Sequence, residues 1–153
     1  MQIRKAEPLD TERLIKMRWD FTIEDHPEKE QADVHVYEKE CRRFLEEAIA
    51  GDRWHIWVAE RAGVIVSHIY IQLVDKVPRP GRVTRPFAYM TNVYTVPSHR
   101  GTGIGSQLLE HIHQWVKEHE YEFILVWPSE AGEPYYKKNE YTRVEEPMEY
   151  IPE

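Results

Sequence analysis

A glycine-rich segment at residues 96–109, VPSHRGTGIGSQLL, has the residue types that bind a phosphate group. Glycines let the backbone turn sharply and let a ligand approach it closely. The run that follows has a helical pattern, and the first turn of a helix presents unpaired N–H groups and the positive end of the helix dipole. Arg100 adds a cation and Ser106 a hydroxyl beside that turn. The segment therefore predicts an anion site at the start of a helix. Its three glycines are Gly101, Gly103 and Gly105.

Two familiar phosphate motifs do not fit this segment. A P-loop requires a lysine and then Ser or Thr after its last glycine, whereas Ser106 and Gln107 follow Gly105. A dinucleotide-binding turn has the spacing G-x-G-x-x-G early in the chain and an acidic residue about 20 positions later. Here the spacing is G-x-G-x-G, and too little chain follows for such a domain. A glycine-rich turn that holds no ligand remains the alternative to an anion site.

The elements around the turn form a strand–turn–helix–strand unit. Residues 87–96 predict a strand, and residues 104–118 predict an amphipathic helix with Ile104 and Leu108 on its buried face. The short apolar run at 121–127 is typical of a buried parallel strand. The segment EPYYKKNEY predicts a short helix, and residues 141–151 a last strand or two.

The first half of the chain predicts two helices and two strands. Asp10 or Thr11 can cap the first helix, which the segment IEDHPEKE interrupts. A second helix is expected from about Ala32, with Cys41 on its apolar face and a stop at Gly51. The runs WHIWVAE and VIVSHIYIQLV predict two strands around a tight turn. The order of elements indicates an α/β fold with a mixed sheet flanked by helices, and residues 1–153 are expected to form a single domain.

Composition argues against several classes of protein. The formal net charge of -7 argues against a nucleic-acid partner, which usually faces a basic surface. No apolar run approaches about 20 residues, so a membrane span is not expected. The single cysteine and an N-terminus without a signal-like apolar run indicate a cytoplasmic protein. The eight histidines include no H-E-x-x-H pair, so no metal site is expected.

The chain resembles the GNAT superfamily of N-acetyltransferases over nearly its whole length. RGTGIG matches the family's R-x-x-G-x-G pattern, and FILVWPSEAGEPYYKKNEYTR is similar to its later strand and F-Y-x-x-x-G-F segment. The resemblance implies a GNAT-like mixed sheet built around the strand–glycine turn–helix unit. It also implies an enzyme that uses acetyl-CoA and no metal to acetylate a primary amine, with a small molecule or a peptide as acceptor. The amine would attack the thioester directly in a ternary complex, and such proteins are often homodimers.

The resemblance assigns roles to particular positions. Two parallel strands, 87–96 and 121–127, would separate to admit the thioester, and an N–H near Tyr94 would stabilise the oxyanion. Tyr136 falls at the position of the family's general acid, and a phenol with its ordinary pKa near ~10 suits a thiolate whose thiol titrates near ~8.5. Backbone groups of Tyr94, Thr95 and Val96 would pair with the pantetheine arm. The pyrophosphate would be bound by Arg100 and by the N–H groups of Gly101, Thr102, Gly103, Ile104, Gly105 and Ser106.

Several positions depart from the family pattern. Ser129 stands where an asparagine often contacts the cofactor, and Glu140 replaces a glycine. The central strand reads Met-Thr-Asn at 90–92, without the carboxylate that often serves as general base. The base would then be water, Glu130 or a residue of the IEDH segment. A protein that binds coenzyme A or a nucleotide without catalysis is the alternative that this gap leaves open.

A cluster of acidic residues between the first two helices bears on the charge of the acceptor. An acidic site concentrates cations, so the cluster predicts a cationic acceptor. A solvated, charged loop explains it equally well. The cluster consists of Glu24, Asp25, Glu28 and Glu30, and Glu130 and Glu133 near the catalytic segment add to it.

Overall fold

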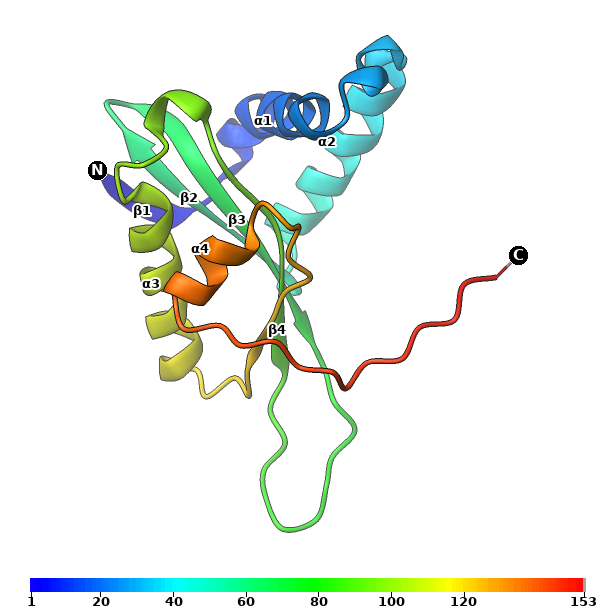
Figure 1. Cartoon of the computed structure of the whole chain (residues 1–153), viewed down its shortest axis with the longest axis vertical. Coiled ribbons are helices and arrows are strands. Elements are labelled where there is room, and N and C mark those ends of the chain that lie inside the picture. The colour runs from blue at the N-terminus through cyan, green and yellow to red at the C-terminus, as the bar shows by residue number, and fades with distance from the viewer. Residues whose placement is uncertain (153) are drawn as a thin grey trace.

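A computed structural model describes residues 1–152 and shows a five-stranded sheet with helices on both faces (Figure 1). The strands lie in the order in which they occur along the chain. The first four are antiparallel neighbours, and β5 is parallel to β4. The strands are β1 (Gln2–Lys5), β2 (Trp54–Arg61), β3 (Val64–Val74), β4 (Phe87–Thr95) and β5 (Ile124–Leu125). The predicted mixed α/β sheet is therefore confirmed.

Two helices pack on each face of the sheet. α1 (Thr11–Asp25) and α2 (Val34–Ala50) cover one face, and α3 (Ile104–Glu118) and α4 (Glu133–Lys138) cover the other. A short 3-10 helix precedes each of α1, α2 and α3: η1 (Pro8–Asp10), η2 (Pro27–Gln31) and η3 (Pro97–His99). No helix within residues 1–152 combines the length and apolar character needed to cross a bilayer.

The alternation of side chains along the strands gives the sheet two apolar cores. On the α3 side, Ile71 and Met90 pack against Leu108 and Ile112. On the α1–α2 side, Val58 and Tyr70 pack with helix residues that include Leu14, Met17 and Leu45. Cys41 is half-buried against this second core, as the helical spacing predicts. The two cores fix the sheet between its helices and so hold β4 in place.

A bulge in β4 sets the direction of the residues that follow it. His68 pairs with Tyr94 and Tyr70 with Thr91, so two residues of β4 oppose one residue of β3. Asn92 lies in this bulge with φ 49, in the left-handed region. The carbonyl oxygen of Asn92 lies 2.8 Å from Nδ1 of the fully buried His68, which therefore donates to it. This bond anchors the bulge to β3.

Some of the element predictions are wrong. Residues 141–151 form no strand, because Pro147 cannot donate to a ladder and the apolar side chains, such as Met148, are exposed. The strand expected at 121–127 is paired only at Ile124–Leu125, since the chain then moves away from β4. β1 was not expected, because its sequence QIRK is short and mostly polar.

The helix boundaries also differ slightly from the predictions. α1 continues to Asp25, through the first residues of the segment expected to interrupt it. α2 begins at Val34, where the Asp33 side chain accepts hydrogen bonds from the N–H groups of His35 and Val36. Asp33 is thus the N-cap, and the helix begins two residues after the start expected at about Ala32.

Candidate active site

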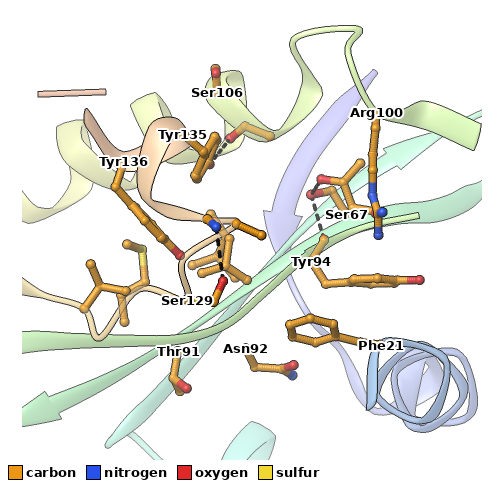
Figure 2. Close-up of a pocket in the computed structure, with 18 of the residues that line it drawn as sticks. Phe21, Ser67, Thr91, Asn92, Tyr94, Arg100, Ser106, Ser129, Tyr135 and Tyr136 are labelled. Carbon is orange, nitrogen blue, oxygen red and sulfur yellow. Dashed lines mark hydrogen bonds between the residues drawn. The ribbon is translucent and has the colours of Figure 1, made fainter. Parts of the chain in front are cut away.

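A cleft of ≈ 650 Å³ opens where β4 and β5 separate. The two strands pair at Ala88–Ile124 and Tyr89–Leu125, and beyond these pairs the chain diverges toward Trp127. The separation expected between these strands is therefore confirmed. Helix α1 borders one side of the cleft, and the glycine turn and α4 border the other (Figure 2). A volume of this size suits a small-molecule site.

Most of the residues singled out from the sequence line this one cleft. Of the catalytic and cofactor-binding residues expected, two do not line it: the Val96 N–H donates to the carbonyl of Val66 in β3, and the Thr102 hydroxyl donates to the carbonyl of His99. Those that line it are Tyr94, Thr95, Arg100, Gly101, Gly103, Ile104, Gly105, Ser106, Ser129 and Tyr136.

The glycine turn delivers the backbone to the start of α3. Gly101 and Gly103 have φ 73 and φ 82, values that side chains other than glycine rarely adopt. Gly103 is the N-cap of α3, and no side chain caps it. The N–H groups of the first helical turn therefore have no intrahelical partners, and they carry the positive end of the helix dipole.

Gly105 has a different role from the other two glycines. A Cβ there would lie 3.4 Å from Thr95 Oγ1 and 3.6 Å from the Tyr135 ring. The Tyr135 hydroxyl donates to the Gly105 carbonyl at 2.9 Å (Figure 2). A Cβ at Gly105 would therefore make only ordinary van der Waals contacts, and the packing of α4 on α3 does not itself require a glycine there.

Arg100 is already bound within the protein. Its guanidinium forms an ion pair with Glu24, with 2.9 Å between Nη2 and Oε2, and Nε donates to the Thr95 carbonyl at 2.8 Å. It also lies 5.4 Å from the centre of the Tyr94 ring. The hydrogen bonds from Arg100 lower the pKa of Glu24. Arg100 therefore links the glycine turn to the end of α1.

Tyr136 enters the cleft from α4 with an unengaged hydroxyl. The residue is buried, and no hydrogen bond joins its hydroxyl to any group in residues 1–152. Figure 2 shows its ring directed from α4 toward Ser129 and β4. Burial raises the pKa of Tyr136 to about 12. The hydroxyl therefore stays protonated at neutral pH and is free to donate to a ligand.

Ser129 holds the loop before α4. Its Oγ accepts from the N–H of Gly132 at 3.1 Å, and its carbonyl accepts from the same N–H at 3.1 Å. The Ser129 hydroxyl hydrogen remains available to a ligand in the cleft. The position therefore orients the segment that carries Tyr136.

Sequence reasoning missed several polar residues of the cleft. Ser67 is buried in β3, where its Oγ lies 2.8 Å from Thr95 Oγ1 and donates to the Tyr94 carbonyl at 3.1 Å. Its signal was a polar pair, Ser67 and His68, inside the apolar run VIVSHIYIQLV. Arg18 also lines the cleft, and only the packing of α1 on the β4 bulge brings it there.

The carboxylates proposed as general base differ in position. Glu24 and Asp25 line the cleft, and Glu130 does not. Glu24 is paired with Arg100, whereas Glu28 and Glu30 lie in η2 outside the cleft lining. Within the described residues 1–152, no three His, Cys, Asp or Glu side chains gather as a metal site would require.

Comparison with known proteins places this fold and cleft in a family. The chain matches the Acetyltransferase (GNAT) family over residues 11–141. A predicted acetyltransferase from Clostridium acetobutylicum, solved with acetyl-CoA, has 29% identity and a TM-score of 0.81, over 98% of this chain and 95% of that one. A GCN5-related N-acetyltransferase from Ralstonia eutropha has 23% identity and a TM-score of 0.77, over 98% and 97%.

A third solved structure is glucosamine-6-phosphate N-acetyltransferase from Arabidopsis thaliana. It has 20% identity and a TM-score of 0.74, over 98% of this chain and 97% of that one. No curated protein matches the chain. The family uses acetyl-CoA as acyl donor. This chain is an acetyltransferase of the GNAT family.

Proposed function

We propose that residues 1–153 form one N-acetyltransferase domain, which transfers the acetyl group of acetyl-CoA to a primary amine by direct attack in a ternary complex. One observation carries the proposal. The cleft between β4 and β5 has the uncapped N-terminus of α3 at one end and the unbonded Tyr136 hydroxyl in its wall. Residues of α1 line its other side, where a second ligand could bind. Donor and acceptor can therefore occupy one cleft together.

The donor side is proposed to bind the phosphates through the backbone. The N–H groups from Gly101 to Ser106 suit a pyrophosphate because they converge on the start of α3. The bond from Val96 to β3 removes its N–H from the groups proposed for the pantetheine arm. Tyr94 lies two residues earlier, its carbonyl accepts from Ser67 of β3, and Thr95 is left as the residue whose backbone faces away from β3. The Thr95 carbonyl accepts one hydrogen bond from Nε of Arg100, and its second lone pair remains for the pantetheine arm. Acetyl-CoA is a co-substrate in this scheme and supplies the reactive thioester.

Tyr136 is proposed to donate to the departing sulfur. A phenol with pKa about 12 is a weaker acid than the sequence-based value of ~10 assumed. Complete proton transfer to a thiolate whose thiol titrates near ~8.5 would be uphill by about 5 kcal/mol. This difference favours a hydrogen bond to sulfur that strengthens as the carbon–sulfur bond breaks. A backbone N–H near Tyr94 would meanwhile stabilise the oxyanion.

The general base is proposed to be water or a carboxylate at the end of α1. Met90, Thr91 and Asn92 supply no carboxylate from β4. Asp25 lines the cleft and forms no ion pair within residues 1–152, whereas Glu24 is engaged by Arg100.

Thiol release from acetyl-CoA tests the proposal directly. The protein is mixed with acetyl-CoA and a panel of polyamines, aminoglycosides, amino acids and N-terminal peptides, and free thiol is measured. Release that depends on an amine, with a matching acetylated product by mass, supports the proposal. A melting temperature that rises with acetyl-CoA, and not with ATP or NAD, supports selective binding of acetyl-CoA by the folded protein. Binding without release for any amine would instead favour a non-catalytic coenzyme A protein.

A further inference from the structure

Arg18 places an unneutralised cation on the α1 side of the cleft. The residue is exposed and lines the cleft together with Phe21 and Asn92. No carboxylate of residues 1–152 lies within 4.0 Å of its guanidinium, in contrast to Arg100, which is paired with Glu24. Burial raises the pKa of Tyr70 beneath it, and the Arg18 charge opposes that rise. Arg18 therefore lines the cleft as a cation with no ion-pair partner among residues 1–152.

Two contacts hold the Arg18 guanidinium in place. It lies 5.5 Å from the centre of the Phe21 ring, and Nη1 donates to Asn92 Oδ1 at 3.2 Å. Asn92 is itself fixed, because its carbonyl accepts from the buried His68 in the β4 bulge. An arginine has five N–H donors, so one bond to Asn92 leaves most of the planar fork free. Such a fork binds a carboxylate or phosphate with two parallel hydrogen bonds.

Arg18 is separate from the proposed phosphate site of the donor. Arg18 precedes Glu24 by six positions in α1, which corresponds to about 9 Å along the helix axis. Glu24 is the residue that contacts Arg100 at the glycine turn. Arg18 instead lies beside the bulge, close to the strand residues expected to face the thioester. An anion bound by Arg18 would therefore belong to the acceptor.

We infer that the acceptor is an amine that also carries an anionic group, a carboxylate or a phosphate, and that Arg18 binds this group. The inference rests on the proposed N-acetyltransferase function and names the acceptor class. Arg18 would fix one end of the acceptor while its amino group reaches the gap between β4 and Tyr136. Asn92 acts through Arg18 by orienting the guanidinium.

Matched acceptor pairs test the inference. Each pair has the same amine with and without the anion: L-amino acids with their amides, and O-phosphoethanolamine with ethanolamine. The wild-type enzyme should prefer the anionic member by about 10- to 100-fold in kcat/KM, the range expected for hydrogen bonds to a charged group. A preference within the amino-acid pairs would indicate a carboxylate, and a preference within the phosphoethanolamine pair would indicate a phosphate.

Variants of Arg18 separate this role from general folding. Arg18→Gln should abolish the preference and leave the KM for acetyl-CoA within about twofold, and Arg18→Lys should retain part of it. Arg61→Gln, an exposed arginine outside the cleft, is the matched control and should keep the preference. An equal or reversed preference in the wild type, or a preference that survives Arg18→Gln, overturns the inference.

The test also distinguishes failure of the inference from failure of the proposed function. Absence of thiol release with every acceptor counts against the function alone. Calorimetric titration of the same pairs in the presence of coenzyme A then measures the anion preference without turnover. Loss of that preference in Arg18→Gln supports the inference, and its absence in the wild type overturns it.

Discussion

Tyr136 and its neighbour Tyr135 should respond in opposite ways to loss of the hydroxyl. Tyr136→Phe removes a group that makes no hydrogen bond within residues 1–152, so the melting temperature should change little. The loss should appear in catalysis, where a positioned acid contributes at least ~10²-fold to kcat, or about 2.7 kcal/mol. Binding of acetyl-CoA should be nearly unchanged, because the ring remains.

Tyr135→Phe is the matched control for this substitution. It removes the 2.9 Å bond to the Gly105 carbonyl, which a typical net hydrogen-bond contribution places at about 0.5–1.5 kcal/mol. For a chain of this length, that corresponds to a fall in Tm of roughly 1–6 °C. Because the Tyr135 hydroxyl is directed at α3, kcat should stay near the wild-type value.

Steady-state kinetics and thermal unfolding of both variants test whether the Tyr136 hydroxyl acts in catalysis. The pH dependence of kcat gives a further check, because a Tyr136 pKa of about 12 predicts no descending limb from this residue below pH ~10. Wild-type turnover in Tyr136→Phe, under conditions where chemistry limits the rate, would refute the assignment. A larger fall in kcat for Tyr135→Phe than for Tyr136→Phe would refute it equally.

Two further predictions concern the glycine turn and the anchor of the β4 bulge. Gly103→Glu adds a side chain at φ 82 and a negative charge beside the proposed phosphate site. The affinity for acetyl-CoA should therefore fall strongly, while circular dichroism shows an intact fold. An unchanged affinity, measured by calorimetry, would place the phosphate site elsewhere. Burial lowers the pKa of His68 to about 4, so its neutral form stabilises the fold above pH ~6.5 and this contribution is lost as pH falls toward ~4. The free energy of unfolding, from urea titrations, should fall by about 3 kcal/mol more in the wild type than in His68→Gln over that window, and equal slopes would show that His68 does not titrate this way.

The fold was largely predictable because its elements have strong local signals. The helix at 104–118 has a continuous apolar stripe, and the hairpin of β2 and β3 is closed by Ala62 and Gly63, both at positive φ. β1 has neither kind of signal, since its four residues are held by pairing with β2. The tail at 141–151 shows the reverse case, in which apolar residues indicated a strand that has no partner strand within residues 1–152.

The cleft was predictable where a motif fixed the backbone and not where packing brought distant residues together. Gly101 and Gly103 are required by their own dihedral angles, so the motif locates the turn. Arg18 reaches the cleft only because α1 crosses the bulge of β4, and nothing near it in the sequence marks a site. The ion pair of Arg100 with Glu24 likewise joins residues far apart in the chain.

The ion pair of Arg100 with Glu24 determines whether Arg100 can also bind the phosphates of coenzyme A. Both partners are partly exposed, and an exposed ion pair contributes only about 0–1 kcal/mol to stability. A pyrophosphate at the start of α3 carries more charge than a single carboxylate and has the N–H groups of the glycine turn beside it. Replacing Glu24 by a phosphate on the same guanidinium therefore costs little free energy. It would also free the Glu24 carboxylate for the acceptor side while Nε of Arg100 keeps its bond to the Thr95 carbonyl, so the Arg100 contacts are compatible with the proposed donor site.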